Sequence, residues 1–377
     1  RAHGWVLLSK GSAASAEAAV FRALVRAQAA RADDVVALAA VDLAHAIGRD
    51  RQRMADALNW VDFAASAIAA RGGDPPLAAR LDTVRGEIFL NAGKLAEAEA
   101  ANRAALRAAL EHAPGTNLEA EARDALGMTL SLRGNLDEAI PMLQTSAEQT
   151  ERLYGTQHSL TATVRMNLAN ALSAAGRYDE SLAQYRAALA VREALFGNES
   201  VQVATLLSNM GQMLQEQGKL DEARPLLERA LAIRVAKLGP DAPPVAKTRA
   251  NLGYLYLDQG AYPAALTELQ LAGAILEKTI GPDHPARADD LGGVGLAWSG
   301  LGKFAKALPP LERAVELAEG GDPVNVASLH AALARALVAS GRDRARGSAM
   351  ARAARKVLVA AGDDKAVADL DAWLRPR

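Results

Sequence analysis

The sequence predicts an all-α fold in which helix hairpins stack into a solenoid. Alanine and leucine, both strong helix formers, dominate the composition. The phrase GKLDEARPLLERAL at residues 218–231 returns in related form along the chain, mostly at an interval of 42 residues. A fixed period of about 20–50 residues indicates a repeat array, in which each unit buries its apolar face against its neighbours.

The repeats align on one glycine, which we call the reference glycine. It recurs as Gly93, Gly134, Gly176, Gly218, Gly260 and Gly302. Small residues stand seven positions before it: Gly86, Gly127, Ala169, Gly211, Gly253 and Gly295. Small residues also stand five and twelve positions after it: Ala98, Ala139, Ser181, Ala223, Ala265 and Ala307, then Ala105, Ser146, Ala188, Ala230, Ala272 and Ala314. Four positions before it the residue is large: Phe89, Leu130, Leu172, Leu214, Tyr256 and Trp298.

These positions predict two helices joined at the reference glycine. Glycine tolerates the left-handed backbone conformation with which many helices end. Acidic pairs such as Asp137-Glu138 and Asp221-Glu222 follow it, where a helix N-terminus favours negative charge. Small residues on both helices would let the two backbones approach closely, and we expect the large residue to fill the gap between them.

With these columns the sequence resembles the tetratricopeptide repeat (TPR) family over six consecutive units, residues 76–320. The resemblance implies a right-handed solenoid of TPR hairpins. A standard unit has about 34 residues, whereas here the period is 42. The extra length would extend the second helix and its exit loop, as in LYGTQHSLTA and IGPDHPARA, which resemble the variant in kinesin light chains.

The two ends of the chain repeat less clearly. Residues 1–75 are expected to hold degenerate helical repeats, with three helices within residues 13–71, and residues 321–377 a degenerate repeat with capping helices. The end segments resemble those of TPR regions that follow the kinase domain in bacterial Ser/Thr protein kinases. Because Arg1 is not an initiator residue, we expect the sequence to be part of a longer protein.

Composition excludes several classes of function. Lys+Arg at 43 nearly balances Asp+Glu at 44, so there is no basic footprint for nucleic acid. The chain has no cysteine, which excludes disulfides and a thiol nucleophile and suits a cytoplasmic location. No uncharged apolar run approaches the ~18–20 residues that span a bilayer. We expect no cofactor and no membrane insertion.

Motifs for catalysis do not occur in the sequence, so we expect no enzyme within this chain. His158 and His284 hold equivalent exit-loop positions, where we expect them to help the turn into the next helix. The stretch SGLGKF at 299–304 lacks the residues of a phosphate-binding loop and fits the turn between two helices. Protein-kinase signatures are also absent from the sequence.

The resemblance places the groove of the array on the first helix of each pair, 13, 10, 9 and 6 residues before the reference glycine. The position nine before holds Asn167, Asn209 and Asn251, whose carboxamides could hold a peptide backbone or instead tie neighbouring helices together. The other candidates are Thr163, Met166, Asn170, Thr205, Ser208, Gln212, Lys247, Ala250 and Tyr254, with Arg80, Glu87, Glu121 and Asp124 toward the N-terminus. The centre of the groove should therefore be polar and nearly uncharged.

The sequence thus predicts a protein-interaction module that docks a protein or peptide, within the regulatory C-terminal region of a bacterial Ser/Thr protein kinase. Two alternatives stay open. One is a self-associating structural scaffold, and the other is the helical arm of a nucleotide-dependent signalling ATPase. The sequence leaves the partner and the oligomeric state undetermined.

Overall fold

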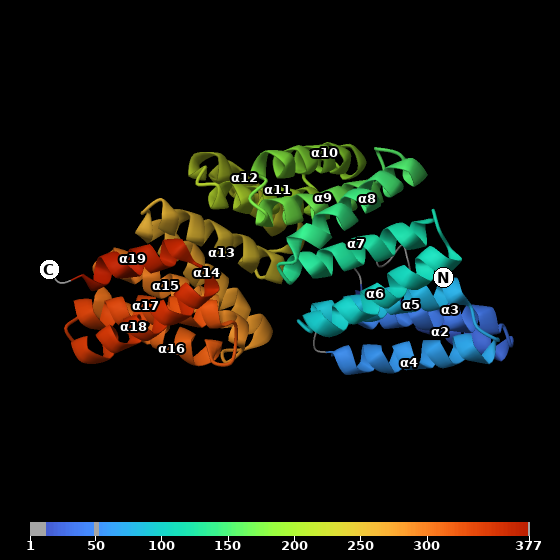
Figure 1. Cartoon of the computed structure of the whole chain (residues 1–377), viewed down its shortest axis with the longest axis horizontal. Coiled ribbons are helices and arrows are strands. Elements are labelled where there is room, and N and C mark those ends of the chain that lie inside the picture. Colours follow the sequence, from blue (N-terminus) through green and yellow to red (C-terminus); the bar gives the residue numbers. More distant parts are fainter. Residues whose placement is uncertain (1–12, 49–52, 376–377) are drawn as a thin grey trace. The chain divides into compact units, whose positions relative to one another are not determined.

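The computed structural model describes residues 13–48 and 53–375, and within them every regular element is helical (Figure 1). The described residues group into two compact units, the first ending at Leu195 and the second beginning at Phe196. The first unit holds α2 (Ala13–Ala29), α3 (Asp33–Gly48), α4 (Met54–Ala70), α5 (Pro75–Asn91), α6 (Leu95–His112), α7 (Asn117–Leu132), α8 (Leu136–Tyr154) and α9 (Ser159–Ala174), and α10 (Tyr178–Phe196) ends at the boundary. The second holds α11 (Val201–Glu216), α12 (Leu220–Leu238), α13 (Pro243–Asp258), α14 (Tyr262–Ile280), the 3₁₀ turn η2 (Pro285–Arg287), α15 (Ala288–Gly300), α16 (Phe304–Ala318), α17 (Pro323–Ala339), α18 (Arg344–Ala361) and α19 (Asp364–Leu374). The predicted all-α solenoid class is confirmed.

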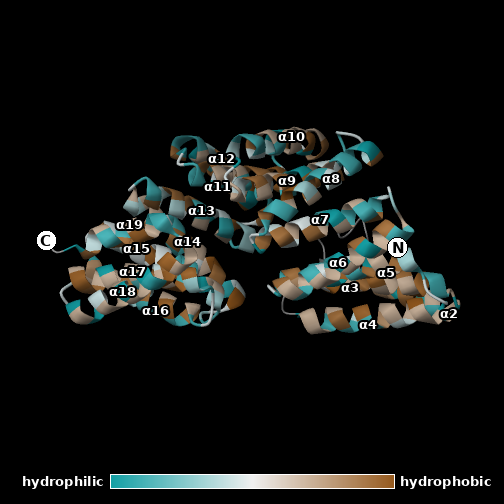
Figure 2. Cartoon of the chain, in the orientation of Figure 1, coloured by the Kyte–Doolittle hydropathy of each residue, from teal (hydrophilic) through white to brown (hydrophobic). Residues whose placement is uncertain are grey.

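Helix lengths account for the long period. The first helices α7, α9, α11 and α13 each have 16 residues, and the second helices α8, α10, α12 and α14 each have 19. Polar and apolar residues share each of these helices (Figure 2). The long second helix is where this sequence exceeds the standard unit, as predicted.

The reference glycine ends the first helix of each hairpin in the left-handed conformation. Its φ lies between 70° and 79° in all six repeats. The next residue then donates its N–H back to the carbonyl of the large residue, as from Asn135 to Leu130 at 2.9 Å and from Lys219 to Leu214 at 2.8 Å. This closing hydrogen bond recurs in all six repeats, so one local motif sets the direction of each second helix.

The small columns allow close helix contact, as the sequence predicts. All twelve residues five and twelve positions after the reference glycine are 0% exposed. A Cβ added to Gly127, Gly211, Gly253 or Gly295 would lie 2.4–2.7 Å from a leucine of the second helix. The backbone of the first helix therefore lies directly against a leucine side chain at these positions, and only glycine fits there without movement.

The large column divides into two kinds of residue. Leu130, Leu172 and Leu214 are at most 3% exposed and fill the gap between the helices, as predicted. The aromatic residues at this position are only partly buried, so part of each ring reaches the surface. Trp298, for example, lies under the ammonium groups of Lys303 and Lys306, at 5.4 and 4.9 Å from its ring. Complete burial of the large residue therefore holds for the leucines and not for the aromatic residues.

Within each unit the first helices stack on one another. In the first unit α3 contacts α5, α5 contacts α7 and α7 contacts α9, and in the second α11, α13, α15 and α17 form the same series. Second helices pack against their own first helices, as α6 does on α5 and α8 on α7. Residues that recur on the first helices therefore share one face.

The predicted helices at both ends are present. Residues 13–71 contain α2, α3 and α4, and the C-terminal segment forms α17, the basic α18 and the short α19. Contacts also join α3 and α4 to α5, so these helices continue the stack. The segment boundaries at residues 75 and 320 stay a prediction.

The glycine contacts generate a stability prediction. In Gly253→Ala the new Cβ would lie 2.5 Å from Leu269 Cγ. We expect the free energy of unfolding to fall by about 1–2 kcal/mol, because overpacking costs about 1–3 kcal/mol and the better helix propensity of alanine returns up to about 1 kcal/mol. Urea denaturation measures the change.

Leu269→Ala supplies the control background. With the leucine shortened, Gly253→Ala should be neutral or stabilising, since the new methyl group then enters vacated space. An equal loss on both backgrounds would contradict the close-contact explanation.

Candidate functional site

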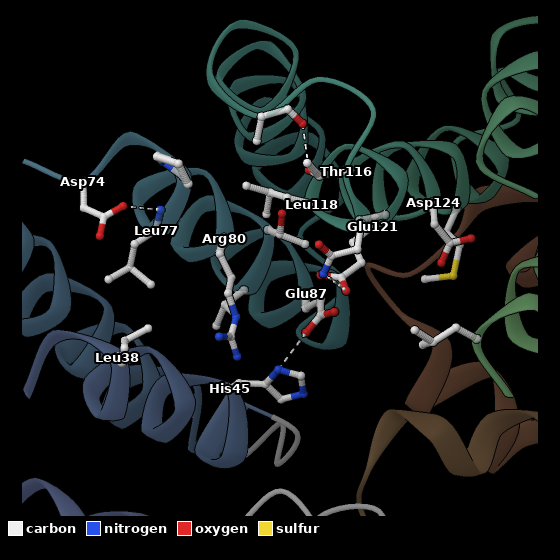
Figure 3. Close-up of a pocket in the computed structure, with 18 residues that line it drawn as sticks. Leu38, His45, Asp74, Leu77, Arg80, Glu87, Thr116, Leu118, Glu121 and Asp124 are labelled. Atoms are coloured by element: carbon white, nitrogen blue, oxygen red, sulfur yellow. Dashed lines mark hydrogen bonds and ion pairs between the residues drawn. The ribbon is translucent and has the colours of Figure 1, made fainter. Parts of the chain in front are cut away.

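A cavity of about 880 Å³ lies in the first unit, and we call it the groove cavity (Figure 3). First helices form most of it: α3 contributes Leu38 and His45, α5 and α7 contribute the larger part, and α9 contributes Leu160. It therefore lies on the face that the stacked first helices share.

The lining includes groove positions predicted from the sequence. Arg80 and Glu87 on α5 and Glu121 and Asp124 on α7 all line the cavity. The remaining groove positions of these two repeats line it as well, namely Thr83, Val84, Ala125 and Met128. The repeat thus places side chains from successive first helices around one space, whereas their role in binding stays a prediction.

The start of α5 is fixed by local chemistry. Asp74 is its N-cap and accepts a hydrogen bond from the N–H of Leu77 at 3.1 Å. Pro75 and Pro76 occupy the first turn, where proline is best tolerated. This short segment places Asp74, Pro76 and Leu77 in the lining of the cavity.

Two ionic contacts border the groove cavity. Arg80 Nη2 donates to Asp42 Oδ1 at 2.7 Å, and Asp42 is only 2% exposed. His45 Nδ1 lies 3.7 Å from Glu87 Oε2, within ion-pair distance when the imidazole is protonated. The arginine of the cavity is therefore already matched by a buried carboxylate from α3.

The two carboxylates that α7 contributes to the groove cavity have amide partners. Asp124 accepts from Asn167 Nδ2 at 3.0 Å, and Glu121 accepts from Asn117 Nδ2 at 3.4 Å. Burial raises the pKa of Asp124 to about 6, and the nearby charges of Glu87 and Glu121 raise it as well, against the effect of the amide. Desolvation by the surrounding protein also raises the pKa of Glu121. Asp124 in particular is held where its ionised form is disfavoured.

The asparagine column lies outside the groove cavity. Asn167 Nδ2 donates to Asp124 on the preceding first helix, and Asn251 Nδ2 donates to Ser208 Oγ at 3.4 Å in the same manner. These two asparagines therefore tie neighbouring first helices together, which was the alternative to backbone binding. Asn209 is partly buried on α11.

Several other predicted groove residues take part in local contacts. Thr163 accepts from Arg192 Nη2 at 2.5 Å, and the hydroxyl of Tyr254 donates to the carbonyl of Asp289 at 2.6 Å. The rest are distributed along the first helices: Asn170 accepts from the hydroxyl of Tyr185, Thr205 and Ser208 lie on α11, and Gln212 and Lys247 are exposed on α11 and α13. None of these residues lines the groove cavity.

Two arginines of the second helices were not among the predicted site residues. Arg192 on α10 reaches Thr163, and Arg234 on α12 reaches Thr205 and Thr248 on the first helices α11 and α13. Arg234 is 6% exposed, and burial lowers its pKa. The two arginines bring positive charge into contact with the groove positions Thr163 and Thr205. The sequence-based expectation was a nearly uncharged centre, and it did not account for these two charges. The sequence signal that could have revealed them is their spacing, because the two arginines occupy the same position in the second helices of successive repeats.

The two loop histidines and the stretch that resembles a phosphate-binding loop have structural roles. His158 and His284 are N-caps whose Nδ1 atoms accept from the N–H groups of Leu160 and Ala286 at 3.2 and 3.1 Å. The stretch SGLGKF forms the turn between α15 and α16. In the described part of the chain, no helix is both long and apolar enough to cross a bilayer.

The raised pKa of Asp124 generates a prediction. The native state holds this proton more tightly than the unfolded chain, whose aspartates titrate near ~3.9. The protonated carboxyl therefore stabilises the native state at low pH, and this stabilisation is lost as the pH rises from that value to about 6. Asparagine does not ionise, so Asp124→Asn keeps its stability over the same range. We expect Asp124→Asn to raise the free energy of unfolding by about 1–3 kcal/mol at about pH 8 and to change it little at about pH 4.

Urea denaturation at the two pH values measures this difference. Glu148→Gln, at an exposed carboxylate on α8, is the control and should change the midpoint at neither pH. If Asp124→Asn were less stable than the parent at the higher pH, the fold would favour the ionised carboxylate and the expected sign would be wrong.

Comparisons with known proteins agree with this architecture. The model of the tetratricopeptide repeat family matches residues 118–194, 202–278 and 251–320. Among curated proteins, none matches the chain significantly.

The chain is similar to several solved structures. The apo form of the quorum sensor NprR from B. thuringiensis is 12% identical, with a TM-score of 0.65 over 94% of this chain and 99% of that one. A Rap protein complexed with Competence and Sporulation Factor is 15% identical, with a TM-score of 0.61 over 90% and 96%. TPR-like repeats of a putative kinesin light chain from Podosopora anserina are 21% identical over 54% and 96%, with a TM-score of 0.47.

The family match spans more than half of the chain and coincides with helix hairpins of the structure. The chain therefore belongs to the tetratricopeptide repeat family.

Proposed function

We propose that this chain is a protein-interaction module whose first helices dock a segment of a partner protein. The observation that carries this proposal is the groove cavity, which lies at the positions that successive repeats project from α5 and α7. A groove of this kind presents side chains from several repeats to one ligand, so affinity can be spread over many contacts.

The chemistry of the lining suits a peptide. Apolar walls come from Leu38, Leu77, Leu118, Met128 and Leu160, and polar groups project between them. Its volume of about 880 Å³ falls within the range of about 300–1,000 Å³ that is typical of ligand pockets. Apolar surface with a few placed polar groups can hold side chains and orient a backbone together.

Two structural neighbours support the same kind of function. One is described as a quorum sensor, and the other was solved in complex with Competence and Sporulation Factor. A helical array of this fold can thus hold a second molecule, and we extend that property to this chain.

At a finer level we propose that the module belongs to the regulatory C-terminal region of a bacterial Ser/Thr protein kinase. The repeat variant and the sequence of the end segments support this assignment. The reading frame upstream of Arg1 tests it, and a frame there without a kinase domain would refute it.

Self-association is a second candidate, because α2 and α4 expose aromatic side chains. Phe21 and Phe63 are 48% and 38% exposed. Both meet Trp60 edge to face, with ring centroids 6.2 and 5.5 Å from that of Trp60.

Sedimentation velocity separates peptide docking from self-association. A monomer that binds peptides supports docking, and a tight oligomer that binds none supports a scaffold.

A selection experiment tests the docking function directly. The full chain is immobilised and challenged with a library of random peptides displayed on phage. We expect enrichment over an empty surface, followed by measurable affinity of synthetic copies in calorimetry. Failure of any peptide to enrich would overturn the proposed function.

The asparagine column supplies a mutational prediction. If Asn209 contacts the backbone of a docked segment, Asn209→Ala should weaken binding of a selected peptide by about 1–3 kcal/mol, because buried amide hydrogen bonds are lost. Isothermal titration calorimetry measures the change, and circular dichroism verifies that the array is folded. Asn198→Ala, at an exposed loop residue, is the matched control. Equal affinities for the two variants would remove Asn209 from the binding surface.

A further inference from the structure

We infer that the groove cavity binds a protein segment that carries a lysine or arginine, whose cationic head meets the carboxylates of Glu87, Glu121 and Asp124. We call these three residues the carboxylate cluster. This inference rests on the proposed function and names the class of partner. The observation behind the inference is that the cavity combines acidic side chains with apolar walls, which complement the charged head and aliphatic stem of a basic residue.

The carboxylate cluster comes from two neighbouring first helices. Glu87 projects from α5, and Glu121 and Asp124 project from α7 toward the same space (Figure 3). Glu121 and Asp124 are three residues apart and therefore share one face of α7. Glu121 is exposed, whereas Glu87 and Asp124 are partly buried. A ligand that enters the cavity can therefore reach acidic side chains from both helices.

The lining carries an excess of negative charge. Four carboxylates line the cavity against one arginine. The guanidinium of that arginine, Arg80, is matched by Asp42 outside the lining, and Asp74 serves as the N-cap of α5. The cavity therefore attracts a cationic group and repels an acidic peptide or nucleic acid.

The partners of the carboxylate cluster leave its charge largely in place. Glu87 lies 3.7 Å from His45, which neutralises it only when the imidazole is protonated. The hydrogen bonds to Glu121 and Asp124 come from neutral amides, and the positive charge of Arg80 also acts on Glu121. A cationic ligand would thus add a charge contact that these hydrogen bonds do not supply.

The protein holds Asp124 at a cost in stability. Burial raises its pKa to about 6, and the charges of Glu87 and Glu121 act in the same direction. Acids held in this way cluster at functional sites, where stability is given up for binding or chemistry. A lysine or arginine head in the cavity would stabilise all three carboxylates together.

The apolar walls fit the rest of a basic side chain and its neighbours. Leu77, Leu118 and Met128 line the same cavity as the carboxylate cluster. Lysine and arginine cover apolar surface with their aliphatic stems while the charged head contacts polar groups. The cavity therefore favours a segment with apolar residues beside the basic one. In the part of the chain that the structure describes, no group of side chains is arranged to hold a metal ion.

Selection with a random peptide library tests the partner class. The parent chain should enrich peptides that contain lysine or arginine beside apolar residues. The double variant Glu121→Gln, Asp124→Asn should lose that preference, and Glu148→Gln, with an exposed carboxylate on α8, should keep it. Enrichment of acidic or uncharged peptides, or a basic preference that survives in the double variant, would overturn the inference.

Affinity measurements on one selected peptide sharpen the test. We expect binding to weaken at least about tenfold in the double variant, and similarly when the basic residue of the peptide is replaced by norleucine. Combining the two changes should cost little more than either alone, because they remove the same contact. Additive losses would place the basic residue elsewhere on the protein. Spermine that competes as well as the peptide would indicate a site for cations without a protein partner.

A pH series provides an independent readout. The titratable and charged groups around the carboxylate cluster are Asp42 and His45 on α3, Asp74 at the start of α5, Arg80 on α5 and Tyr154 on α8. Burial raises the pKa of Tyr154, and the charge of Glu121 raises it further. Affinity should fall as the pH drops through about 6, the pKa of Asp124, because the carboxylate loses its charge while the basic residue of the peptide keeps its own.

Asp124→Asn serves as the control for this pH series. Its affinity should be lower than that of the parent above about pH 6 and should change less across the range. Equal pH dependence in the parent and in Asp124→Asn would contradict a role for this carboxylate in binding.

The outcomes separate the inference from the function on which it rests. If no peptide enriches on the parent chain, docking itself fails. If peptides enrich without basic residues, docking stands and the partner class is wrong. Circular dichroism of each variant excludes loss of the fold as the cause.

Discussion

Close contact between the two helices of each hairpin is the constraint on which the structure depends. Small residues recur at three positions, and in four of the six repeats a leucine of the second helix lies directly against the glycine backbone of the first. This contact sets the separation of the helices, and the turn at the reference glycine sets their direction. Once one hairpin has this geometry, its neighbours repeat it, and the first helices stack within each unit.

That stacking separates the residues that hold the fold from those that can bind. The packed columns face the partner helix and are fully buried, whereas the groove positions of α5 and α7 line a cavity. Side chains at groove positions can therefore vary while the hairpins are kept. In the first unit they combine acidic groups with apolar walls, and the burial of Asp124 opposes its ionisation. Binding a cation would offset this cost.

Some groove residues serve the fold as well. Asn167 and Asn251 each donate to the preceding first helix, so their amides help to set the spacing of the stack. The contact of Asn167 with Asp124 also links this spacing to the groove cavity, because the acceptor lines it. A residue in a repeat can thus support its neighbour and shape the binding surface at once.

The sequence by itself determined the helices, the turns and the packed columns. These features depend on local backbone conformation and on side-chain size, which recur in register and can be recognised without coordinates. The resemblance to the repeat family also implied that Arg80, Glu87, Glu121 and Asp124 share one face. Only the tertiary structure decided that these residues line a cavity, that Asp42 neutralises Arg80, and that second-helix arginines reach the first helices. The reason is physical: such contacts join separate helices, and they depend on side-chain direction and on the distance between elements, which the period of a sequence does not encode.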